Sequence, residues 1–576
     1  MPNSPVAQLP QAPISPERYG GPRVTHGALV EVRDGTPLSL DLLRPDADGA
    51  FPVVLIRTPY DKVASRELAP GTSEGLPYDH AFIHGLVRRG YVVAMQDVRG
   101  RFNSDGSWHP YIHEQADGHD TVEWIARQPW CDGNIGMVGR SYVGFTQWAA
   151  AAGRSPALKA IVPIGAQPDL FDSGFPVFNG VFNLPMAELL ITMGRRSFQI
   201  RDFMHSVLHE THPWFEALPL ADLPRAAGVE PPDWWQEMMA HPTRDEYWTQ
   251  SSYADALDGN RVAALNISGW YDLTLHGALL NYRRMRERGA AGARDHQRLV
   301  MGPWAHWADV SAATGPIDFG PHAVGGLGAY VTRFLDRWLK NEDNGIDDDA
   351  RVHVFVMGAN EWRAADDWPL PATRYVPLHL RAGGRLTESA PGDEPPDGYR
   401  YDPLDPVRSP WSMHNGPIDD AGLVDRPDVL CFTSDPLTAP LEVIGPVRFV
   451  LHAASSALDT DWHIRLVDVH PDGYAQFLAH GVTRARFRRS FAAPELLTPG
   501  EVERFDIDLY GTANRFLPGH RIRVEITSSW FPRYDRNLNS GADNPFHDSE
   551  PVVAEQAIYH DALRASHLLL PIVDRS

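Results

Sequence analysis

Cysteine is scarce in this chain of 576 residues: there are only two, Cys131 and Cys431, far apart in the sequence. Two isolated cysteines do not make the disulfide framework of a small secreted domain, and they do not make a cysteine-rich zinc site. No run of 18 apolar residues occurs, so we expect no membrane-spanning helix. The opening residues lack the basic and then apolar segments of a secretory signal. These absences favour a protein of the cytoplasm.

Basic side chains are also in the minority. The chain has 52 Lys and Arg against 74 Asp and Glu, a formal net charge of −22. This charge repels polyanions, and no stripe of Lys and Arg opposes it, so we expect no nucleic-acid binding. Hydrophobic residues make up 43% and charged residues 22%, which is typical of globular proteins. The length predicts two or three domains with substantial cores.

The first part of the chain alternates short apolar runs with longer stretches that suit helices. Short continuous apolar runs are typical of strands buried on both faces of a parallel sheet. Residues 28–45 form two alternating runs about Asp34-Gly35, which predict a β-hairpin. The predicted parallel strands are 52–57, 91–98, 134–139, 158–165, 262–269 and 297–302. We therefore predict an α/β domain over 25–169 and 252–345, after a loose Pro-rich arm at 1–24.

Two regions depart from this alternation. Residues 170–251 are rich in helical patterns and in Trp, and predict a helical cap over the carboxyl edge of the sheet; helical packing without a ligand role is the alternative. From 346 to 576 the apolar period becomes two, with Pro, Gly and Asp turns between the runs. Short alternating strands of this kind predict an all-β sandwich. Examples are RVHVFVMG, PVRFVLHA, DWHIRLVDV and HRIRVEI.

Ser141 is the strongest candidate for a nucleophile. It lies in Gly139-Arg140-Ser141-Tyr142-Val143-Gly144, between a predicted strand and a predicted helix. A turn of this kind lifts the serine hydroxyl above the sheet, and the helix N-terminus adds N–H groups and positive potential. The second glycine comes one residue later than in G-x-S-x-G, and a serine that only caps the helix is the alternative. The strand–turn–helix context favours the nucleophile.

A serine nucleophile needs a base and an orienting carboxylate. In an α/β-hydrolase they follow in the order Ser, Asp or Glu, His, each just after a strand. Asp272 follows the strand 262–269 within Gly-Trp-Tyr-Asp, and His306 follows the strand 297–302 within Gly-Pro-Trp-Ala-His. Both therefore occupy the positions that this order requires, although any one of the 25 histidines is a weak candidate by itself.

Two tyrosines are candidates for stabilising a developing oxyanion. The N–H of Tyr142 directly follows the proposed nucleophile. The loop Arg57-Thr58-Pro59-Tyr60-Asp61-Lys62 leaves an early strand, where the second donor is normally found. Because Pro59 has no N–H, the Tyr60 hydroxyl becomes the candidate donor, with a packing tyrosine as the alternative. In the nearby loop 97–106, we expect an ion pair between Asp97 and Arg99.

These residues lie within a longer set of motifs: PYDK, DVRGRFNSDG, GRSYVGFTQW, GWYD, GPWAHW, FLDRWLK and GHRIRVEITSSWFPRYDRN. In this order, from about residue 25 to the C-terminus, they resemble the cocaine esterase-like branch of the X-Pro dipeptidyl-peptidase superfamily. The resemblance implies a triad of Ser141, Asp272 and His306, with an oxyanion hole from the Tyr60 hydroxyl and the Tyr142 N–H. It also implies an α/β-hydrolase domain, a helical cap, a C-terminal jelly-roll domain, and a serine esterase that forms an acyl-enzyme.

The substrate does not follow from the resemblance, because the family spans aryl esters, α-amino acid esters, β-lactam acyl groups and dipeptidyl amides. We expect a small carboxylic ester, with an amidase, acylase or X-Pro dipeptidyl-peptidase as the alternative. Thr274 stands where cocaine-cleaving members carry an aromatic residue, which argues against a benzoyl pocket. Asp169 is a candidate for binding an α-amino group, with a loop cap as its alternative. Trp307, beside His306, is a candidate for substrate contact.

An alternative from another class is a non-catalytic carbohydrate-binding protein, but the ordered serine, aspartate and histidine argue against it. We expect no metal and no cofactor, because His113, Glu114 and His119 lack the HExxH spacing of a zinc protease. The expected partner is a small molecule rather than a nucleic acid or a membrane. A homodimer is compatible with the sequence.

Overall fold

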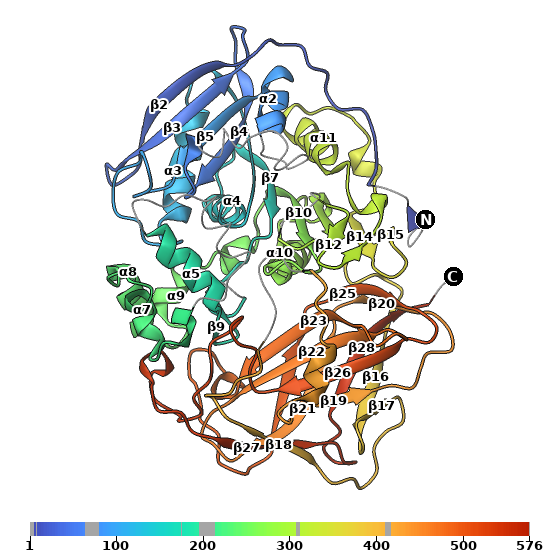
Figure 1. Cartoon of the computed structure of the whole chain (residues 1–576). Helices are drawn as coiled ribbons and strands as arrows, with labels where there is room; N and C mark the ends of the chain where they lie inside the picture. The colour runs from blue at the N-terminus through green and yellow to red at the C-terminus, as the bar shows by residue number, and fades with distance from the viewer. Residues whose placement is uncertain are drawn as a thin grey trace.

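Two large β-sheets form the frame of the protein, one above the other in Figure 1. The computed structural model describes residues 5–6, 9–63, 80–173, 176–194, 213–306, 311–408 and 416–574. Helices pack against the first sheet, and the second sheet belongs to a separate C-terminal β domain. The chain therefore combines a mixed α/β part with an all-β part, as the change in apolar period predicts.

The first sheet has parallel strands in its centre and antiparallel strands at its edges. Its order is β1-β15-β14-β11-β10-β7-β6-β4-β5-β3-β2, and every pairing from β14 to β5 is parallel. The strands are β1 (Pro5–Val6), β2 (Arg23–Glu31), β3 (Pro37–Arg44), β4 (Phe51–Thr58), β5 (Val92–Asp97), β6 (Cys131–Arg140), β7 (Leu158–Ile164), β10 (Ala263–Gly269), β11 (Gln297–Gly302), β14 (Val352–Val356) and β15 (Glu361–Ala365).

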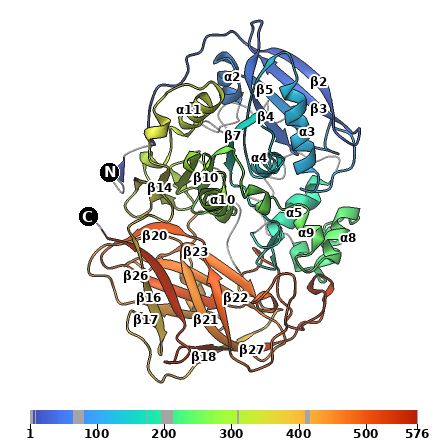
Figure 2. The same ribbon diagram turned by 180° about the vertical axis from the view of Figure 1, so that it is seen from behind.

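Helices cover both faces of this sheet, which explains why its central strands are continuous apolar runs. Figures 1 and 2 show α2 and α11 on one side and α3, α4 and α10 on the other. These helices are α2 (His80–Arg88), α3 (Glu114–Ala126), α4 (Tyr142–Ala152), α10 (Leu275–Arg288) and α11 (Leu327–Leu339). The six predicted parallel strands and the hairpin of β2 and β3 are confirmed, with Gly35 at φ 83° in the hairpin turn.

One predicted strand of the β sandwich belongs to the first sheet instead. The run RVHVFVMG, assigned to the β sandwich, forms β14, and this strand pairs in parallel with β11 of the first sheet. β15 then pairs with β14 in antiparallel fashion. A period of two is as typical of an antiparallel edge hairpin as of a sandwich, so the pattern alone does not distinguish them. The second sheet begins only at Thr373.

The predicted loose arm at the N-terminus is also wrong for much of its length. Ser15 is buried, and its N–H and hydroxyl donate to the two carboxylate oxygens of Asp336 at 2.8 and 2.7 Å. The N–H groups of Arg18 and Tyr19 donate to the carbonyl of Arg88. Further upstream, β1 pairs with β15 at the sheet edge. Proline-rich composition does not reveal such contacts, because they depend on partners distant in sequence.

The predicted helical region 170–251 is mainly helical in its described residues. It opens with a short hairpin and continues through short helices, which lie beside both sheets in Figures 1 and 2. The N–H of Phe182 donates to Asp535 of the second sheet's domain at 2.7 Å. The described elements are β8 (Val177–Phe178), β9 (Val181–Phe182), α5 (Leu184–Met193), α7 (Leu223–Ala226), α8 (Asp233–Ala240) and α9 (Glu246–Thr249).

The second sheet has 13 strands in the described part of the chain, and its pairings are antiparallel except that of β17 with β19. One of them, β22, is buried over its whole length. Its strands are β16 (Thr373–Arg381), β17 (Arg385–Thr387), β18 (Asp397–Tyr401), β19 (Leu430–Thr433), β20 (Leu441–Gly445), β21 (Arg448–Ser455), β22 (Asp461–Val469), β23 (Ala475–Arg484), β24 (Glu503–Asp508), β25 (Thr512–Phe516), β26 (Arg521–Thr527), β27 (Ala554–Tyr559) and β28 (His567–Val573).

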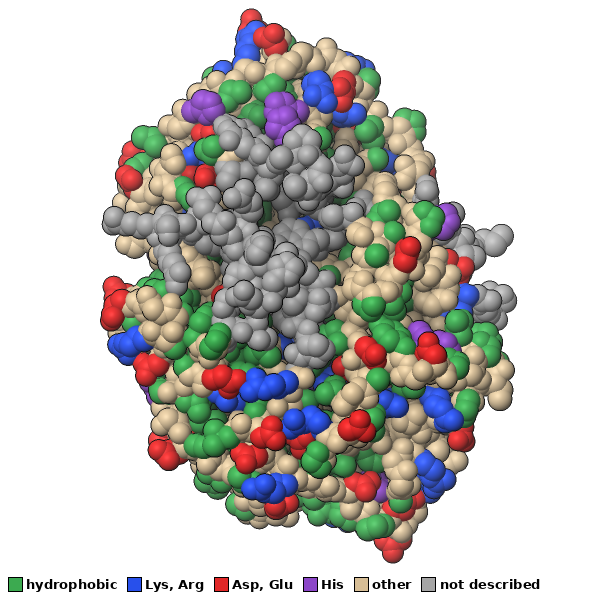
Figure 3. Space-filling model, in the orientation of Figure 1, with side chains coloured by type: hydrophobic (Ala, Val, Ile, Leu, Met, Phe, Trp, Pro, Cys, Tyr) green, Lys and Arg blue, Asp and Glu red, His purple; other side chains and the backbone are tan. Residues whose placement is uncertain are grey.

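The surface carries its negative charge in a dispersed form. On the face drawn in Figure 3, acidic and basic side chains alternate over the C-terminal domain rather than gathering into one patch of either sign. Within the described residues, no helix has the length and apolar character needed to cross a bilayer.

Candidate active site

Ser141 lies on a sharp turn between β6 and α4. Its backbone has φ 60° and ψ −126°, a strained combination that costs a residue other than glycine about 1–3 kcal/mol. The Ser141 N–H donates to the carbonyl of Ile164, at the end of β7, over 2.8 Å. This bond ties the turn to the neighbouring strand. The Ser141 side chain is half-buried, so it stays accessible at the carboxyl edge of the sheet.

The glycines on either side of Ser141 are required by close packing. A Cβ atom at Gly139 would lie 2.2 Å from Cγ1 of Val143, and the φ of Gly139 is 143°. A Cβ atom at Gly144 would lie 3.0 Å from the carbonyl oxygen of Ile164. The late second glycine of the sequence motif therefore has a steric cause, because it lets α4 approach the end of β7.

Asp272 and His306 lie in contact, as their positions after β10 and β11 predict. Nδ1 of His306 is 2.8 Å from Oδ1 of Asp272, and both side chains are buried. The Thr274 N–H and hydroxyl donate to the same oxygen at 2.9 Å, and the Ser268 hydroxyl donates to the other at 3.0 Å. With Nδ1 as the donor toward the carboxylate, Nε2 of His306 is left as the basic nitrogen.

The Asp272 carboxyl is ionised at neutral pH. Its burial acts to raise the pKa, but the charge and hydrogen bond of His306 and the two bonds from Thr274 outweigh burial and lower the pKa below its ordinary value of 3.8. A buried carboxylate with these partners holds the imidazole in one orientation and favours its protonated form during a reaction.

The two loops that carry this pair are bonded to each other. The N–H of Tyr271 donates to the carbonyl of Trp304 at 3.0 Å, and the N–H of Trp270 donates to the carbonyl of Gly302 at 2.9 Å. A Cβ atom at Gly269 would lie 2.0 Å from the Trp304 oxygen. Only glycine allows this approach, so the Gly of the Gly-Trp-Tyr-Asp motif sets the spacing between the acidic and the basic residue.

Tyr60 lies in a loop that a distant arginine holds. The Tyr60 N–H donates to the Thr58 hydroxyl at 3.0 Å, and the side chain is half-buried. The Pro59 carbonyl accepts from Nε of Arg101 at 3.1 Å. A second nitrogen of Arg101 donates to the carbonyl of Met193, at the end of α5. Arg101 thus links the Tyr60 loop to the helical region.

The loop 97–106 is held by other ion pairs than the one expected. Asp97 does not pair with Arg99: it accepts from the N–H and from Nζ of Lys62, each at 2.8 Å. Arg99 instead makes a bidentate pair with Asp117 and a further bond to Asp34. Asp97 points toward Lys62 because its strand β5 lies next to β4, from which the Tyr60 loop leaves.

Tyr142 is the first residue of α4, so its N–H belongs to the helical turn that has no intrahelical acceptor. Its side chain is buried away from that N–H: the hydroxyl donates to Glu114 at 2.9 Å and accepts from the N–H of Tyr111 at 2.8 Å. Glu114 also pairs with buried Arg57 at 2.9 Å. This network fixes the first turn of the helix.

The candidates for substrate contact have other partners. Asp169 is buried, pairs with Arg244 at 2.6 Å and accepts from the Phe171 N–H at 2.8 Å. These are the contacts of its alternative role as a loop cap. Thr274 is buried, and its hydroxyl donates to the carboxylate that faces His306. Trp307 lies outside the described residues.

Sequence reasoning missed three residues that hold this site: Ser268, Arg101 and Glu114. Ser268 ends a buried strand, where a hydroxyl is an unusual side chain, and this was the one available signal. Arg101 and Glu114 act through partners tens of residues away, so no local pattern marks them.

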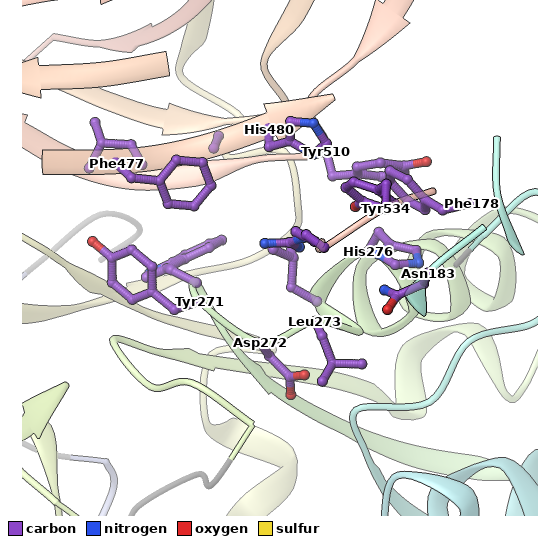
Figure 4. A pocket seen from close by; sticks show the side chains of 15 residues that line it. Phe178, Asn183, Tyr271, Asp272, Leu273, His276, Phe477, His480, Tyr510 and Tyr534 are labelled. Atoms are coloured by element: carbon purple, nitrogen blue, oxygen red, sulfur yellow. The ribbon is translucent and has the colours of Figure 1, made fainter. Parts of the chain in front are cut away.

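A small cavity separates the Asp272 loop from the second sheet (Figure 4). Tyr271, Asp272 and Leu273 border it on one side, and Phe477 and His480 of β23 on the other. The cavity volume is about 30 Å³, room for about two waters. In Figure 4 the Asp272 carboxylate points away from Phe477 and His480, so the second sheet packs behind the loop.

Comparison with known proteins gives matches along nearly the whole chain. The model of the X-Pro dipeptidyl-peptidase (S15 family) matches residues 34–308. The model of the X-Pro dipeptidyl-peptidase C-terminal non-catalytic domain matches residues 344–569. Cocaine esterase from Rhodococcus sp. (strain MB1 Bresler) is 37% identical, covering 96% of this chain and 100% of that protein.

Two solved structures resemble the protein over 98% of each chain, both with a TM-score of 0.82. One is an α-amino acid ester hydrolase, at 26% sequence identity. The other is an aminopeptidase from a marine sediment archaeon, Thaumarchaeota archaeon, at 25% identity. The first name denotes the hydrolysis of esters and the second denotes a peptidase.

Proposed function

We propose that Ser141, Asp272 and His306 carry out the chemistry of this chain. The chain belongs to the cocaine esterase-like hydrolases of the X-Pro dipeptidyl-peptidase superfamily and is a serine hydrolase of esters. The observation that carries this proposal is the 2.8 Å contact between His306 and Asp272, at the same sheet edge as the strained turn of Ser141. A capping serine has no need of such a pair.

The reaction follows from these positions. Nε2 of His306 accepts the hydroxyl proton of Ser141 while Oγ attacks the ester carbonyl carbon, and Asp272 stabilises the imidazolium through Nδ1. The carbonyl oxygen becomes an oxyanion, held by the Tyr142 N–H and the Tyr60 hydroxyl. The alcohol leaves with the proton from His306. Water, activated by the same histidine, then hydrolyses the acyl-enzyme and restores Ser141.

Arg101 and Glu114 support this mechanism as positioning residues. Arg101 bonds the Pro59 carbonyl and so holds the loop of Tyr60, while Glu114 fixes the side chain of Tyr142 at the start of α4. We assign Thr274 to positioning Asp272, and Asp169 to bonding Arg244, because these contacts use the polar atoms that a substrate would need.

The domain roles are part of the proposal. We assign the first sheet and its helices to an α/β-hydrolase domain, residues 170–251 to a cap, and the second sheet to a jelly-roll domain that packs against both. The bond that the Phe182 N–H donates to Asp535 joins the cap to the second sheet's domain, and the bond that Gln476 donates to Tyr271 joins this domain to the Asp272 loop. A homodimer, which is compatible with the sequence, stays untested and can be measured by sedimentation.

A paired assay tests the activity and separates it from its alternative. Purified protein is given p-nitrophenyl esters of increasing acyl length and, in parallel, Ala-Pro-p-nitroanilide, with Ser141→Ala as the control. We expect ester turnover that the substitution abolishes. Strong anilide turnover with poor ester turnover would replace the esterase by an aminopeptidase at the same triad, as the archaeal neighbour's title suggests.

A further inference from the structure

A cluster of metal-ligating side chains lies in the second sheet, apart from the proposed triad. Asp468, His470 and His520 each offer one ligand atom, and these atoms lie within 4.8 Å of one another. Within the described residues this is the one group of three such side chains that meets this spacing. The sequence did not reveal it, because the three residues come from two segments about 50 positions apart.

Strand register brings the three side chains together. β22 ends at Val469, which pairs with Arg521 at the start of antiparallel β26. The residues just beyond this pair, His470 and His520, therefore face each other, and their ring centroids are 4.3 Å apart. Asp468 is two residues before His470, so both side chains project from the same side of the strand.

Asn514 and Gln476 hold these side chains as outer-shell residues hold metal ligands. Oδ1 of Asp468 is 2.8 Å from Nδ1 of His520, and Oδ2 accepts from Asn514 at 3.0 Å. Nε2 of His470 is 3.3 Å from Oε1 of Gln476. Asp468 and His520 are buried, whereas His470 is half-buried and leaves the cluster accessible from solvent.

We propose that Asp468, His470 and His520 form a site for a divalent transition ion of the Zn²⁺ class, with water at the remaining position. Two imidazoles and a carboxylate suit Zn²⁺ better than Ca²⁺ or Mg²⁺, because the latter two ions take oxygen ligands. Ligand atoms around one zinc are about 3.3 Å apart, so the cluster closes by small side-chain rotations.

The proposed role of the ion is structural. It clamps the turn after β22 to the start of β26, and Gln476 beside it donates to the Tyr271 hydroxyl at 2.9 Å, one residue from Asp272. An ion that binds the folded chain but not the unfolded chain stabilises the folded chain, so the melting temperature rises as the ion concentration rises. This inference does not depend on the esterase proposal, because its readouts are binding and melting rather than turnover.

The test is a titration of the full chain, freed of metal, with Zn²⁺ followed by calorimetry and Co²⁺ followed by visible absorption. We expect about one ion per chain, a tetrahedral or five-coordinate Co²⁺ spectrum and a rise in melting temperature. His520→Ala is expected to weaken binding about 100-fold or more, and Asp468→Asn about 10- to 100-fold. Melting curves of the metal-free variants check that each still folds.

His84→Ala is the matched control. The rings of His80 and His84 stack on α2 with their centroids 4.0 Å apart, and neither residue belongs to the Asp468 cluster. Removing His84 is expected to leave the Zn²⁺ affinity and the Co²⁺ spectrum unchanged. The proposal is overturned if the wild-type chain does not bind the ion, or if His520→Ala binds it as tightly as His84→Ala.

Discussion

The carboxyl edge of the first sheet and the interior of the second differ in where they keep their charged groups. In the first, Asp272 and His306 lie in loops just after strands, at the same sheet edge as the half-buried Ser141. In the second, buried charged residues lie in the strands themselves: Arg484, at the end of β23, makes two bonds to Asp461 at 2.9 Å and further bonds to Asp535. Under the proposed mechanism, the first set serves chemistry and the second serves the domain's stability.

The largest expected effect concerns Asp272→Asn. The amide keeps the shape but cannot hold the His306 proton at Nδ1, so we expect kcat to fall about 10⁴-fold, with little change in the melting temperature. Steady-state kinetics and thermal unfolding, measured together, check this. If the variant lost activity only because it no longer folds, Asp272 would serve stability like the charged residues of the second sheet, and the two regions would not differ.

Arg484→Met is the opposite case. Removing the Arg484 guanidinium leaves Asp461 and Asp535 as buried carboxylates without their cation, so we expect the free energy of unfolding to decrease by about 3–5 kcal/mol. Denaturant unfolding measures this, while titration with an active-site probe gives kcat per folded molecule, which is expected to stay near the wild-type value. A matched control is Arg374→Met, whose pair with Asp574 is exposed.

Tyr60→Phe tests the smaller contribution of the oxyanion donor at the first sheet. Removing one donor is expected to lower kcat about 10²- to 10³-fold with KM little changed. The ring is kept, so packing is preserved. If Tyr60 were only a packing residue, as the sequence also allowed, kcat would be unchanged.

The smallest effect concerns His276, at the junction of the two regions. It lies on α10 and packs against Phe178 and Tyr510, and burial lowers its pKa from 6.5 to about 3. Below pH 6.5 the unfolded chain therefore binds a proton at this histidine, whereas the folded chain does not. As a result, the free energy of unfolding decreases as the pH is lowered from 6.5 to about 3. His276→Leu is expected to flatten that slope by about one proton, measured by denaturant unfolding against pH. An unchanged slope would contradict the buried neutral state.

The sequence predicted the parts of the fold in which local pattern and position agree. Strands buried on both faces are continuous apolar runs, so the parallel strands β4, β5, β6, β7, β10 and β11 and the order Ser141, Asp272, His306 could be inferred before any coordinates. Contacts between distant segments could not, and the Ser15 bonds to Asp336, the Arg101 bond to Pro59 and the placement of β14 in the first sheet are of this kind. The same limit hid the Asp468 cluster.

The central claim is that Ser141 becomes acylated, and the most direct test is to find the adduct. The protein is treated with a fluorophosphonate and digested, and the peptide that contains Ser141 is analysed by tandem mass spectrometry. The account predicts an adduct of about one probe per chain on Ser141, absent in Ser141→Ala and slowed strongly in Asp272→Asn. An unmodified Ser141, or label on another residue at the same rate, would contradict it.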